Sequence, residues 1–590
     1  MDKPGRALIA VSLLAAACAS SDAAPSSSPA GPPVLEDPTL RSLGAYWIIR
    51  GDDNRNARVD MEYRRVGDAP WRQSLPMFRV EKGATSQKTH EPELAVPDDS
   101  WLFAGSLVML QPDTAYEIRL SFIDPDGGRD VRLLRSRTIA EPVAPAAMPV
   151  RHVGPGAGGG RGTPTDPFKG FAEAEKHAAP GTLFLVHKGI YDAPFAVNAS
   201  GAPGKPIVWR AAGDGEAVIR GAGKAIGIQA SGAHDVWFEG LGVRGVAVGI
   251  AANDAFRIVI RRCQISVGMY GINFNSNPSL ATAGFFVSDN IIEGPCTWPR
   301  TKGIEDPRGI QATGRGHVIC HNRVRGFADA IDTFPSRICA AIDIHDNEIS
   351  EMTDDGIEMD FSERNTRCFR NRLTNVFQGI SVQPVYGGPA YIFRNALYNV
   401  DLETFKMHHN GSPKHEVDWA PSGALMYHNT SVRIGDPLVL WTSADVRNCR
   451  YRNNLFIGTN SRFGYDNTAL MVDCDFDYDG FGGGPWEVFL KWNGEHYLTL
   501  ADVKARAPVE RHAVFVGAAS VFASGITTPT DVKKAAEIRV NDLRLKPGTP
   551  AVDRGEVLPG FNDDYRGKAP DLGAFETGDE LPAYGPRPVK

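Results

Sequence analysis

Five side chains between positions 332 and 408 are of types that do acid–base or metal chemistry. They are the carboxylates Asp332, Glu358 and Asp360, the amine Lys406 and the imidazole His408. A desolvated lysine with a lowered pKa can abstract a proton, carboxylate oxygens bind Ca²⁺, and a pair of carboxylates can hydrolyse a glycosidic bond. Each of these chemistries requires a fold that brings the distant residues to one place.

A repeat of short strand-like segments is able to position them. The apolar anchors of these segments are Ile228, Ile250, Ile272, Ile310, Ile331, Ile357, Ile380 and Phe405, and successive anchors lie 22, 22, 38, 21, 26, 23 and 25 residues apart. A period near 22 with occasional insertions fits one coil of a parallel β-helix, and is too short for helical-pair repeats or propeller blades. The repeat predicts an all-β protein whose main domain, residues 148–520, is a right-handed parallel β-helix.

The register of these strands predicts which side chains share a face. Successive strand residues point to opposite faces, so residues next to inward anchors point outward. One outward column is then Asp332, Glu358, Ser381 and Lys406, and a second, two residues further along, is Phe334, Asp360, Gln383 and His408. The turn before the strand adds Asp329 in one coil and Asp354 and Asp355 in the next. The chemistry is therefore expected on consecutive coils of one outer face.

Two long insertions flank this face. Residues 294–308 include Trp298 and Arg308, and residues 409–421 include Trp419. Loops of this length in a solenoid are usually functional, and their aromatic side chains can stack on sugar rings. We expect Gln383, Trp298, Trp419 and Arg308 to bind substrate, and Asp332, Glu358, Asp360 and Asp355 to be the candidate ligands of a Ca²⁺ ion.

A second strand in each repeat ends in the pattern Asn-x-apolar. The repeated positions are Asn290, Asn322, Asn347, Asn371, Asn395, Asn429 and Asn453. Stacked coils would align these amides at the strand spacing, so that they hydrogen-bond along a column. The pattern resembles the asparagine ladder of pectate-lyase-like β-helix proteins. Residues 153–191, with a helix expected at 171–178, resemble the first coil and helical cap of such proteins, and residues 545–576 resemble their closing segment.

The N-terminal part of the chain has a different pattern. Residues 38–142 alternate apolar and polar positions in short runs broken by turns, which predicts an antiparallel β-sandwich. Residues 110–118 resemble the tyrosine corner of fibronectin type III domains, in which the hydroxyl of Tyr116 would bond to the upstream backbone. No candidate for chemistry stands out here, and the resemblance implies a spacer or docking module.

The first 37 residues predict export. Residues 1–17 have the charged, apolar and small-residue layout of a secretory signal. Cys18 follows a sequence that resembles a bacterial lipobox. Residues 18–37 predict a flexible tether. Lipidation of Cys18 and ordinary cleavage are both open, so the protein is expected as an outer-membrane lipoprotein, in the periplasm or outside the cell. Seven further cysteines show no zinc-binding spacing. Some could pair in an exported protein, and buried free thiols are the alternative.

Composition and resemblance together limit the function. The net charge of -7, from 63 basic and 70 acidic residues, argues against nucleic acid or an anionic membrane as partner. The resemblance implies a polysaccharide substrate and, first, a lyase acting by β-elimination, with Lys406 as the base and Ca²⁺ as a possible cofactor. A glycoside hydrolase using paired carboxylates and a non-catalytic glycan-binding adhesin are the alternatives. Residues 521–590 are expected to close the solenoid.

Overall fold

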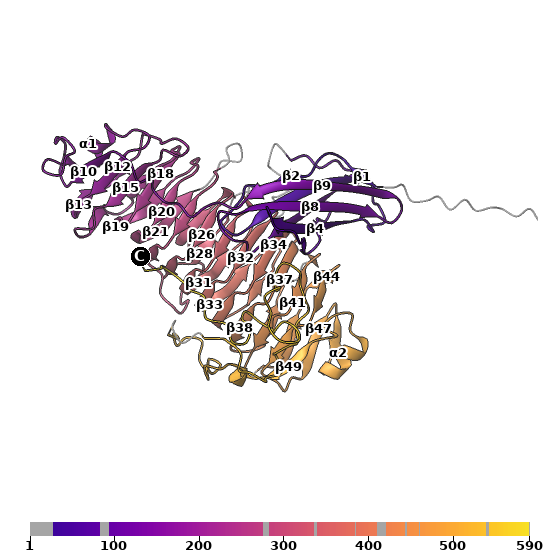
Figure 1. The fold of residues 1–590 in the computed structure, drawn as a ribbon. Helices are drawn as coiled ribbons and strands as arrows, with labels where there is room; N and C mark the ends of the chain where they lie inside the picture. Colours follow the sequence, from indigo (N-terminus) through magenta and orange to yellow (C-terminus); the bar gives the residue numbers. More distant parts are fainter. Residues whose placement is uncertain are drawn as a thin grey trace, which may run out of the picture.

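The computed structural model describes residues 27–82, 94–274, 282–334, 339–383, 385–409, 420–442, 445–459, 461–537 and 542–588. Cys18 and Trp419 lie outside the described residues. An antiparallel β-structure at the N-terminus lies against the side of a long parallel solenoid (Figure 1). The all-β class and the parallel β-helix predicted from the repeat are confirmed.

The N-terminal domain consists of two antiparallel sheets packed on a shared core. One sheet contains β1 (Ser28–Pro29), β2 (Val34–Leu35), β3 (Leu43–Arg50), β6 (Phe78–Arg79) and β7 (Ser100–Leu107). The other contains β4 (Arg58–Arg65), β5 (Arg72–Gln73), β8 (Ala115–Asp124) and β9 (Gly128–Arg137). Inward residues such as Trp47, Val59 and Leu120 are fully buried. The backbone N–H of Gln111 donates to the Tyr116 hydroxyl over 3.0 Å, as a tyrosine corner requires, and the relationship to fibronectin type III domains stays a prediction.

One long parallel sheet of the solenoid carries the candidate site. Its strands are β13 (Gly189–Asp192), β14 (Phe195–Ala196), β16 (Ala217–Arg220), β17 (Ile226–Gln229), β19 (Gly242–Ala251), β21 (Gln264–Phe274), β23 (Ile291–Glu293), β24 (Arg308–Ala312), β27 (Arg323–Arg325), β28 (Asp329–Asp332), β31 (Glu348–Glu358), β33 (Arg372–Ser381), β35 (Ala396–Val400), β36 (Phe405–Lys406), β38 (Thr430–Arg433), β42 (Leu455–Ile457), β46 (Gly480–Gly482) and β49 (Val514–Gly517). The anchors from Ile228 to Phe405 pair one with the next in the order predicted from the repeat.

The opposing sheet carries the N-terminal domain on part of its outer face, around β30 (Asp343–His345), β32 (Thr366–Phe369) and β34 (Tyr386–Phe393) (Figure 1). Its strands are β10 (Val150–Gly154), β11 (Phe168–Lys169), β12 (Leu183–Val186), β15 (Ile207–Ala211), β18 (Val236–Glu239), β20 (Val259–Arg261), β22 (Phe286–Ser288), β26 (Val318–Cys320), β30, β32, β34, β37 (Ser422–Tyr427), β40 (Asp445–Arg447), β41 (Arg450–Arg452), β44 (Leu470–Val472) and β45 (Asp475–Asp477). Smaller sheets pair β25 (Gly314–Arg315) with β29 (Cys339–Ala340), and join β39 (Leu438–Leu440), β43 (Phe463–Asn467), β47 (Val488–Trp492) and β48 (Glu495–Tyr497).

A buried asparagine ladder runs along the turns between the coils. Each side-chain amide donates to the next side-chain oxygen over 2.9–3.1 Å, in the order Asn290, Asn322, Asn347, Asn371, Asn395, Asn429, Asn454 and Asp479. All of these side chains are fully buried. The predicted Asn453 is wrong by one position: its amide bonds outward to the carbonyl of Glu556 over 2.8 Å, while Asn454 occupies the column.

Both ends of the solenoid are covered. Helix α1 (Phe171–Glu175), shorter than the expected 171–178, places Phe171 on Phe195 at the first coil, and α2 (Leu500–Arg506) lies at the last coils (Figure 1). After the short 3₁₀ turn Ala519–Val521 the chain runs back along the solenoid. Gly573 bonds to the carbonyl of Asn453, Gly585 to that of Asp346, and Arg587 pairs with Asp289 at 2.7 Å.

The N-terminal domain is firmly packed on the solenoid. Its Thr39 and Ser42 hydroxyls donate to Asp343 of β30 over 2.6 and 3.0 Å. The fully buried Arg367 of β32 pairs with Asp343 and also donates to Ser106 of β7 over 3.1 Å. A domain hydrogen-bonded to a buried ion pair of the solenoid has little freedom as a swinging spacer.

The seven cysteines in the described part of the chain are free thiols, and six of them are buried. The alternative of unpaired buried thiols therefore holds for this structure. Among the described residues, no helix has both the length and the apolar character required to span a membrane.

Candidate functional site

The predicted outward column forms on consecutive coils. The strand pairings place Gln311 beside Asp332, Asp332 beside Glu358, Glu358 beside Ser381, and Ser381 beside Lys406. The anchors Ile331, Ile357, Ile380 and Phe405 are buried in the core behind them. The expected register is confirmed. The column is less open than an exposed groove, because Asp332 is 0%, Asp360 4% and Glu358 7% exposed.

Arg308 forms ion pairs with two of the carboxylates. Its Nη1 lies 2.7 Å from Asp329 Oδ2 and its Nε 2.8 Å from Asp332 Oδ2. Asp329 is 1% exposed, so the guanidinium neutralises charge that would otherwise be strongly destabilising in the interior. Arg308 was expected to bind substrate, and in the structure its charge is used inside the protein.

Three carboxylates converge beside this ion pair. Asp329, Asp355 and Glu358 each offer an oxygen, and these oxygens all lie within 4.8 Å of one another. Asp355 Oδ1 and Glu358 Oε2 are buried and accept no hydrogen bond within the described residues. An oxygen-only donor set with unsatisfied buried oxygens fits a hard cation such as Ca²⁺. We refer to Asp329, Asp355 and Glu358 as the carboxylate cluster.

The cluster differs from the expected ligand set at two positions. Asp355 and Glu358 belong to both sets, whereas Asp329, expected only as a neighbour in the turn, takes the place of Asp332. Both Asp329 and Asp332 pair with Arg308. Asp360 points to other partners, because its Oδ1 accepts from the Ser381 hydroxyl and from the Gln383 backbone N–H, both over 2.6 Å. Asp360 therefore positions the neighbouring coil.

Lys406 is the amine of the site. Its Nζ lies 2.6 Å from Asp355 Oδ2, and its side chain is 12% exposed. Desolvation lowers the pKa of Lys406, but the charges of Asp355, Asp360 and Asp354 outweigh it and raise that pKa above its ordinary value. The expectation of a lowered pKa is wrong for this arrangement, because it considered burial without the surrounding carboxylates.

The carboxyl groups have raised pKa values. Burial raises the pKa of Asp355 to about 7 in spite of Lys406, and burial raises the pKa of Asp332 to about 7 in spite of Arg308. Burial and the repulsion of Asp329 hold the pKa of Glu358 well above its usual range. With one lysine and one arginine for this many acids, the site holds protons near neutral pH or requires further positive charge.

A network missed by the sequence interpretation continues the face beyond Lys406. His408 Nε2 lies 2.9 Å from Oε2 of the buried Glu403, whose Oε1 accepts from the backbone N–H of Trp441 over 2.9 Å. The Trp441 ring is 44% exposed, and its Nε1 donates to Asp466 over 2.7 Å. Lys491 holds Asp466 at 2.6 Å. Trp441, Asp466 and Lys491 lie beyond Phe405, the last of the apolar anchors that identified the earlier strands.

The first insertion approaches the site through an arginine. Arg300 lies 3.4 Å from Asp354 and stacks at 4.4 Å on the ring of Phe377. Trp298, expected to bind substrate, instead donates its indole N–H to the carbonyl of Val532 in the returning C-terminal chain over 3.1 Å. Trp419 lies outside the described residues.

The comparisons with known proteins reach only the fold. No protein-family model matches the chain, and no curated protein matches it. Among solved structures, pectate lyase Pel9A is 17% identical with a TM-score of 0.42, over 73% of this chain and 98% of that one. XylC in complex with xylose is 12% identical with a TM-score of 0.43, over 58% and 85%. A polygalacturonase from Erwinia carotovora ssp. carotovora is 10% identical with a TM-score of 0.29, over 58% and 96%.

Proposed function

We propose that the protein is a polysaccharide lyase that cleaves a uronate-containing glycan by β-elimination. The observation that carries this proposal is the placement of one amine, Lys406, 2.6 Å from a cluster of buried carboxylates with unsatisfied oxygens. β-Elimination needs a base for the proton on C5 of the uronate and positive charge near its carboxylate. Lys406 is the candidate base, and Asp329, Asp355 and Glu358 are the candidate ligands of a divalent cation.

The residues present divide the work as follows. A divalent cation, when bound, supplies the positive charge that neutralises the cluster and the substrate carboxylate. Asp355 then no longer requires Lys406 as its counter-ion, so the amine can lose its proton. Lys406 takes the C5 proton, the C4–C5 double bond forms, the bond from C4 to the glycosidic oxygen breaks, and that oxygen takes a proton from water. Asp360 and Ser381 hold the coil between Glu358 and Lys406 in place.

Trp441 extends the proposed site along the solenoid. Its ring is exposed while its indole N–H and backbone N–H are both fixed, by Asp466 and Glu403. A rigid aromatic surface of this kind binds the apolar face of a sugar with little loss of conformational entropy. We propose that a glycan bound at Lys406 continues over His408 to Trp441.

A glycoside hydrolase is the second candidate. Asp332 and Glu358 pair directly on adjacent strands, and the pKa of Asp332 is raised to about 7 by burial, which suits a general acid. This assignment would leave Lys406 as a charge partner without a chemical step.

The decisive experiment separates these functions by their products. The protein is incubated with acidic and neutral polysaccharides, with Ca²⁺ or with a chelator, while the ultraviolet absorbance of unsaturated uronates and the release of reducing ends are recorded. A rise in absorbance that is lost on chelation and in Lys406→Ala supports the lyase. Lys205→Ala, an exposed lysine elsewhere on the solenoid, is the matched control. Reducing ends without absorbance indicate the hydrolase, and binding without either product indicates a glycan-binding protein.

Export belongs to the same proposal. Polymeric glycans are met outside the cytoplasm, and residues 1–17 with Cys18 have the layout of a lipoprotein signal. Radiolabelled palmitate incorporation, compared between the parent and Cys18→Ala, tests the lipid anchor. Labelling that persists in Cys18→Ala contradicts it.

A further inference from the structure

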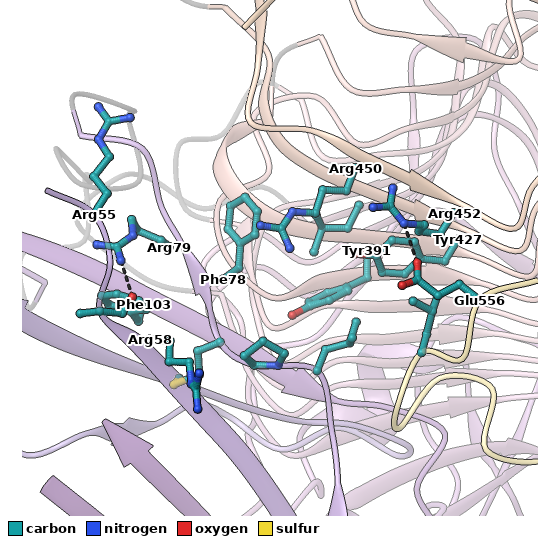
Figure 2. A pocket seen from close by; sticks show the side chains of 16 residues that line it. Arg55, Arg58, Phe78, Arg79, Phe103, Tyr391, Tyr427, Arg450, Arg452 and Glu556 are labelled. Atoms are coloured by element: carbon teal, nitrogen blue, oxygen red, sulfur yellow. Dashed lines mark hydrogen bonds and ion pairs between the residues drawn. The ribbon is translucent and has the colours of Figure 1, made fainter. Parts of the chain in front are cut away.

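A cavity lies between the N-terminal domain and the solenoid. It has a volume of about 370 Å³ and is lined by Phe78 and Arg79 of β6, by Tyr391, Tyr427 and Arg450 of the solenoid, and by Glu556 of the returning C-terminal chain (Figure 2). An adjoining hollow of about 170 Å³ shares Arg55, Arg79 and Arg450 with it. This cleft opens over β34, β37 and β41, in the sheet opposite to the one that carries the carboxylate cluster.

The cleft arises where the N-terminal domain stops covering the solenoid. Tyr391 pairs with Leu425, and Leu425 with Arg450, on successive strands. Tyr391 lies under the domain, where its hydroxyl accepts from the Ser106 backbone N–H over 3.2 Å. Arg450, two strands further, is exposed. The outer face of the solenoid thus changes from aromatic to basic at the edge of the domain, and the cleft has both kinds of lining.

Arginines outnumber carboxylates in the lining of the cleft. The larger cavity is lined by the five arginines Arg55, Arg58, Arg79, Arg450 and Arg452 and by one carboxylate, Glu556. The adjoining hollow adds the carboxylates Glu81 and Asp473. An excess of one sign of charge in a surface cleft attracts ligands of the opposite sign.

Four of these arginines have carboxylate partners. Arg55 lies 3.4 Å from Asp473, and Arg58 lies 3.2 Å from Asp60.

The other two, Arg79 and Arg452, are less exposed. Arg79 pairs with the buried Asp52 and lies at 4.7 Å over the ring of Phe103. Arg452 is held by Glu556 at 2.7 Å and by Asp475 at 2.6 Å. The guanidinium groups of Arg79 and Arg452 therefore line the cleft in fixed positions.

Arg450 differs from them. Within the described residues it has no carboxylate partner, and its guanidinium lies at 5.6 Å over the ring of Phe78, facing the cleft (Figure 2). A guanidinium stacked on an aromatic ring, with its hydrogen-bond donors unused, is pre-organised to take a carboxylate in a two-pronged contact.

We propose that this cleft is a non-catalytic binding site for a carboxylate-bearing oligosaccharide, with Arg450 as the principal contact of the carboxylate. The nearly buried side chains of Phe78, Tyr391 and Tyr427 form the apolar floor of the cleft, on which the edge of a sugar ring can rest. The choice of an acidic glycan over other organic anions rests on the proposed function. A second site on the same polymer raises its effective concentration at the carboxylate cluster without taking part in the reaction.

The test is calorimetric titration of the full chain carrying Lys406→Ala, so that no ligand is consumed. The probes are tetramers of galacturonate, glucuronate and mannuronate, each with a carboxyl-reduced counterpart. We expect Arg450→Glu to weaken binding of at least one acidic tetramer by about tenfold or more, and Arg450→Lys to weaken it less. Arg462→Ala, which removes an exposed solenoid arginine paired with Glu487 outside the cleft, should bind like the parent.

Three results would overturn the proposal: unchanged binding in Arg450→Glu, equal binding of the carboxyl-reduced tetramers, or no binding of any acidic tetramer. Its failure can be distinguished from failure of the proposed function. The protein with Lys406 intact is assayed for unsaturated products in parallel. If it forms these products but binding does not depend on Arg450, the cleft proposal is rejected and the lyase proposal stands. Arg450-dependent binding without unsaturated products rejects the lyase alone.

Discussion

Removal of a divalent cation is expected to destabilise the protein far more at pH 8 than at pH 5. Burial raises the pKa of Asp355 from 3.8 to about 7. Because the folded-state pKa lies above the unfolded one, the protonated carboxyl favours the fold: its contribution is fully present below pH ~4 and is lost as the pH rises through about 7. A cation in the carboxylate cluster replaces those protons, so its stabilising effect must grow over the same range.

The size of this effect follows from the shift. One pKa unit corresponds to about 1.4 kcal/mol, so a rise of about three units makes ionised Asp355 cost on the order of 4 kcal/mol at pH 8 without a cation. That is a large part of the roughly 5–15 kcal/mol by which proteins are stable. Asp329 and Glu358 have raised pKa values for the same reason, burial, and act in the same direction.

Urea unfolding between pH 5 and pH 8, with excess Ca²⁺ or with a chelator, measures the effect. Asp329→Asn and Glu358→Gln should lose most of the Ca²⁺ stabilisation at pH 8 and, in chelator, be more stable than the parent. Asp445→Asn removes a partly exposed carboxylate of the solenoid and should behave like the parent. Ca²⁺ stabilisation that is equal at pH 5 and pH 8, or that survives in Asp329→Asn, would refute the assignment of the cluster as a cation site.

Substitutions at three positions test other parts of the structure. Lys406→Arg and Lys406→Ala should each lose at least about a hundredfold in turnover, measured with Ca²⁺ at a temperature where circular dichroism shows both variants folded, because arginine stays protonated. An arginine variant that keeps most of its activity would exclude Lys406 as the base. Asn371→Leu should lower the free energy of unfolding by about 3 kcal/mol or more, since several buried partners lose a hydrogen bond. Asn198→Leu, at an exposed site, should leave that free energy unchanged. Equal stabilities of the two variants would contradict the structural role of the asparagine ladder. Trp441→Ala should raise KM about fivefold with little change in kcat, as for ~1 kcal/mol of aromatic contact, with Trp71→Ala in the N-terminal domain as control; an unchanged KM would remove Trp441 from the glycan path.

The repeat allowed the strand register to be predicted from the sequence, and the limits of that prediction are equally physical. The anchors from Ile228 to Phe405 are separated by one coil each, so period and side-chain alternation together fix which residues face outward. The same reasoning failed at Asn453, because two adjacent asparagines both fit the pattern. Only the backbone decides between them: Asn453 has a positive φ of 61° and points to the closing chain, and Asn454 enters the ladder.

The ion-pair partners and pKa shifts of the site could not be predicted from the repeat of apolar anchors. Register gave the direction of Asp332 but not its rotamer. It therefore did not reveal that Arg308 would pair with both Asp329 and Asp332, or that Asp329 rather than Asp332 would join the cluster. The sign of the pKa shift of Lys406 depends on how many carboxylates lie within a few ångströms, which alternation alone cannot supply. Glu403 and Trp441 were missed because their role depends on hydrogen bonds between coils of different lengths.

The location of the site in the solenoid has an energetic explanation. A cluster of buried acids destabilises the coils that carry it, and those coils are also held by hydrogen bonds on their other sides. The strand that ends in Glu358 begins directly after the ladder residue Asn347, and the preceding strand carries Asp343, which the N-terminal domain binds through Thr39 and Ser42. Buried polar networks that are fully satisfied make their surroundings rigid, and a rigid support allows an unfavourable, pre-organised charge arrangement to persist. The packing of the N-terminal domain against these coils therefore belongs to the design of the site, although it contributes no residue to the carboxylate cluster.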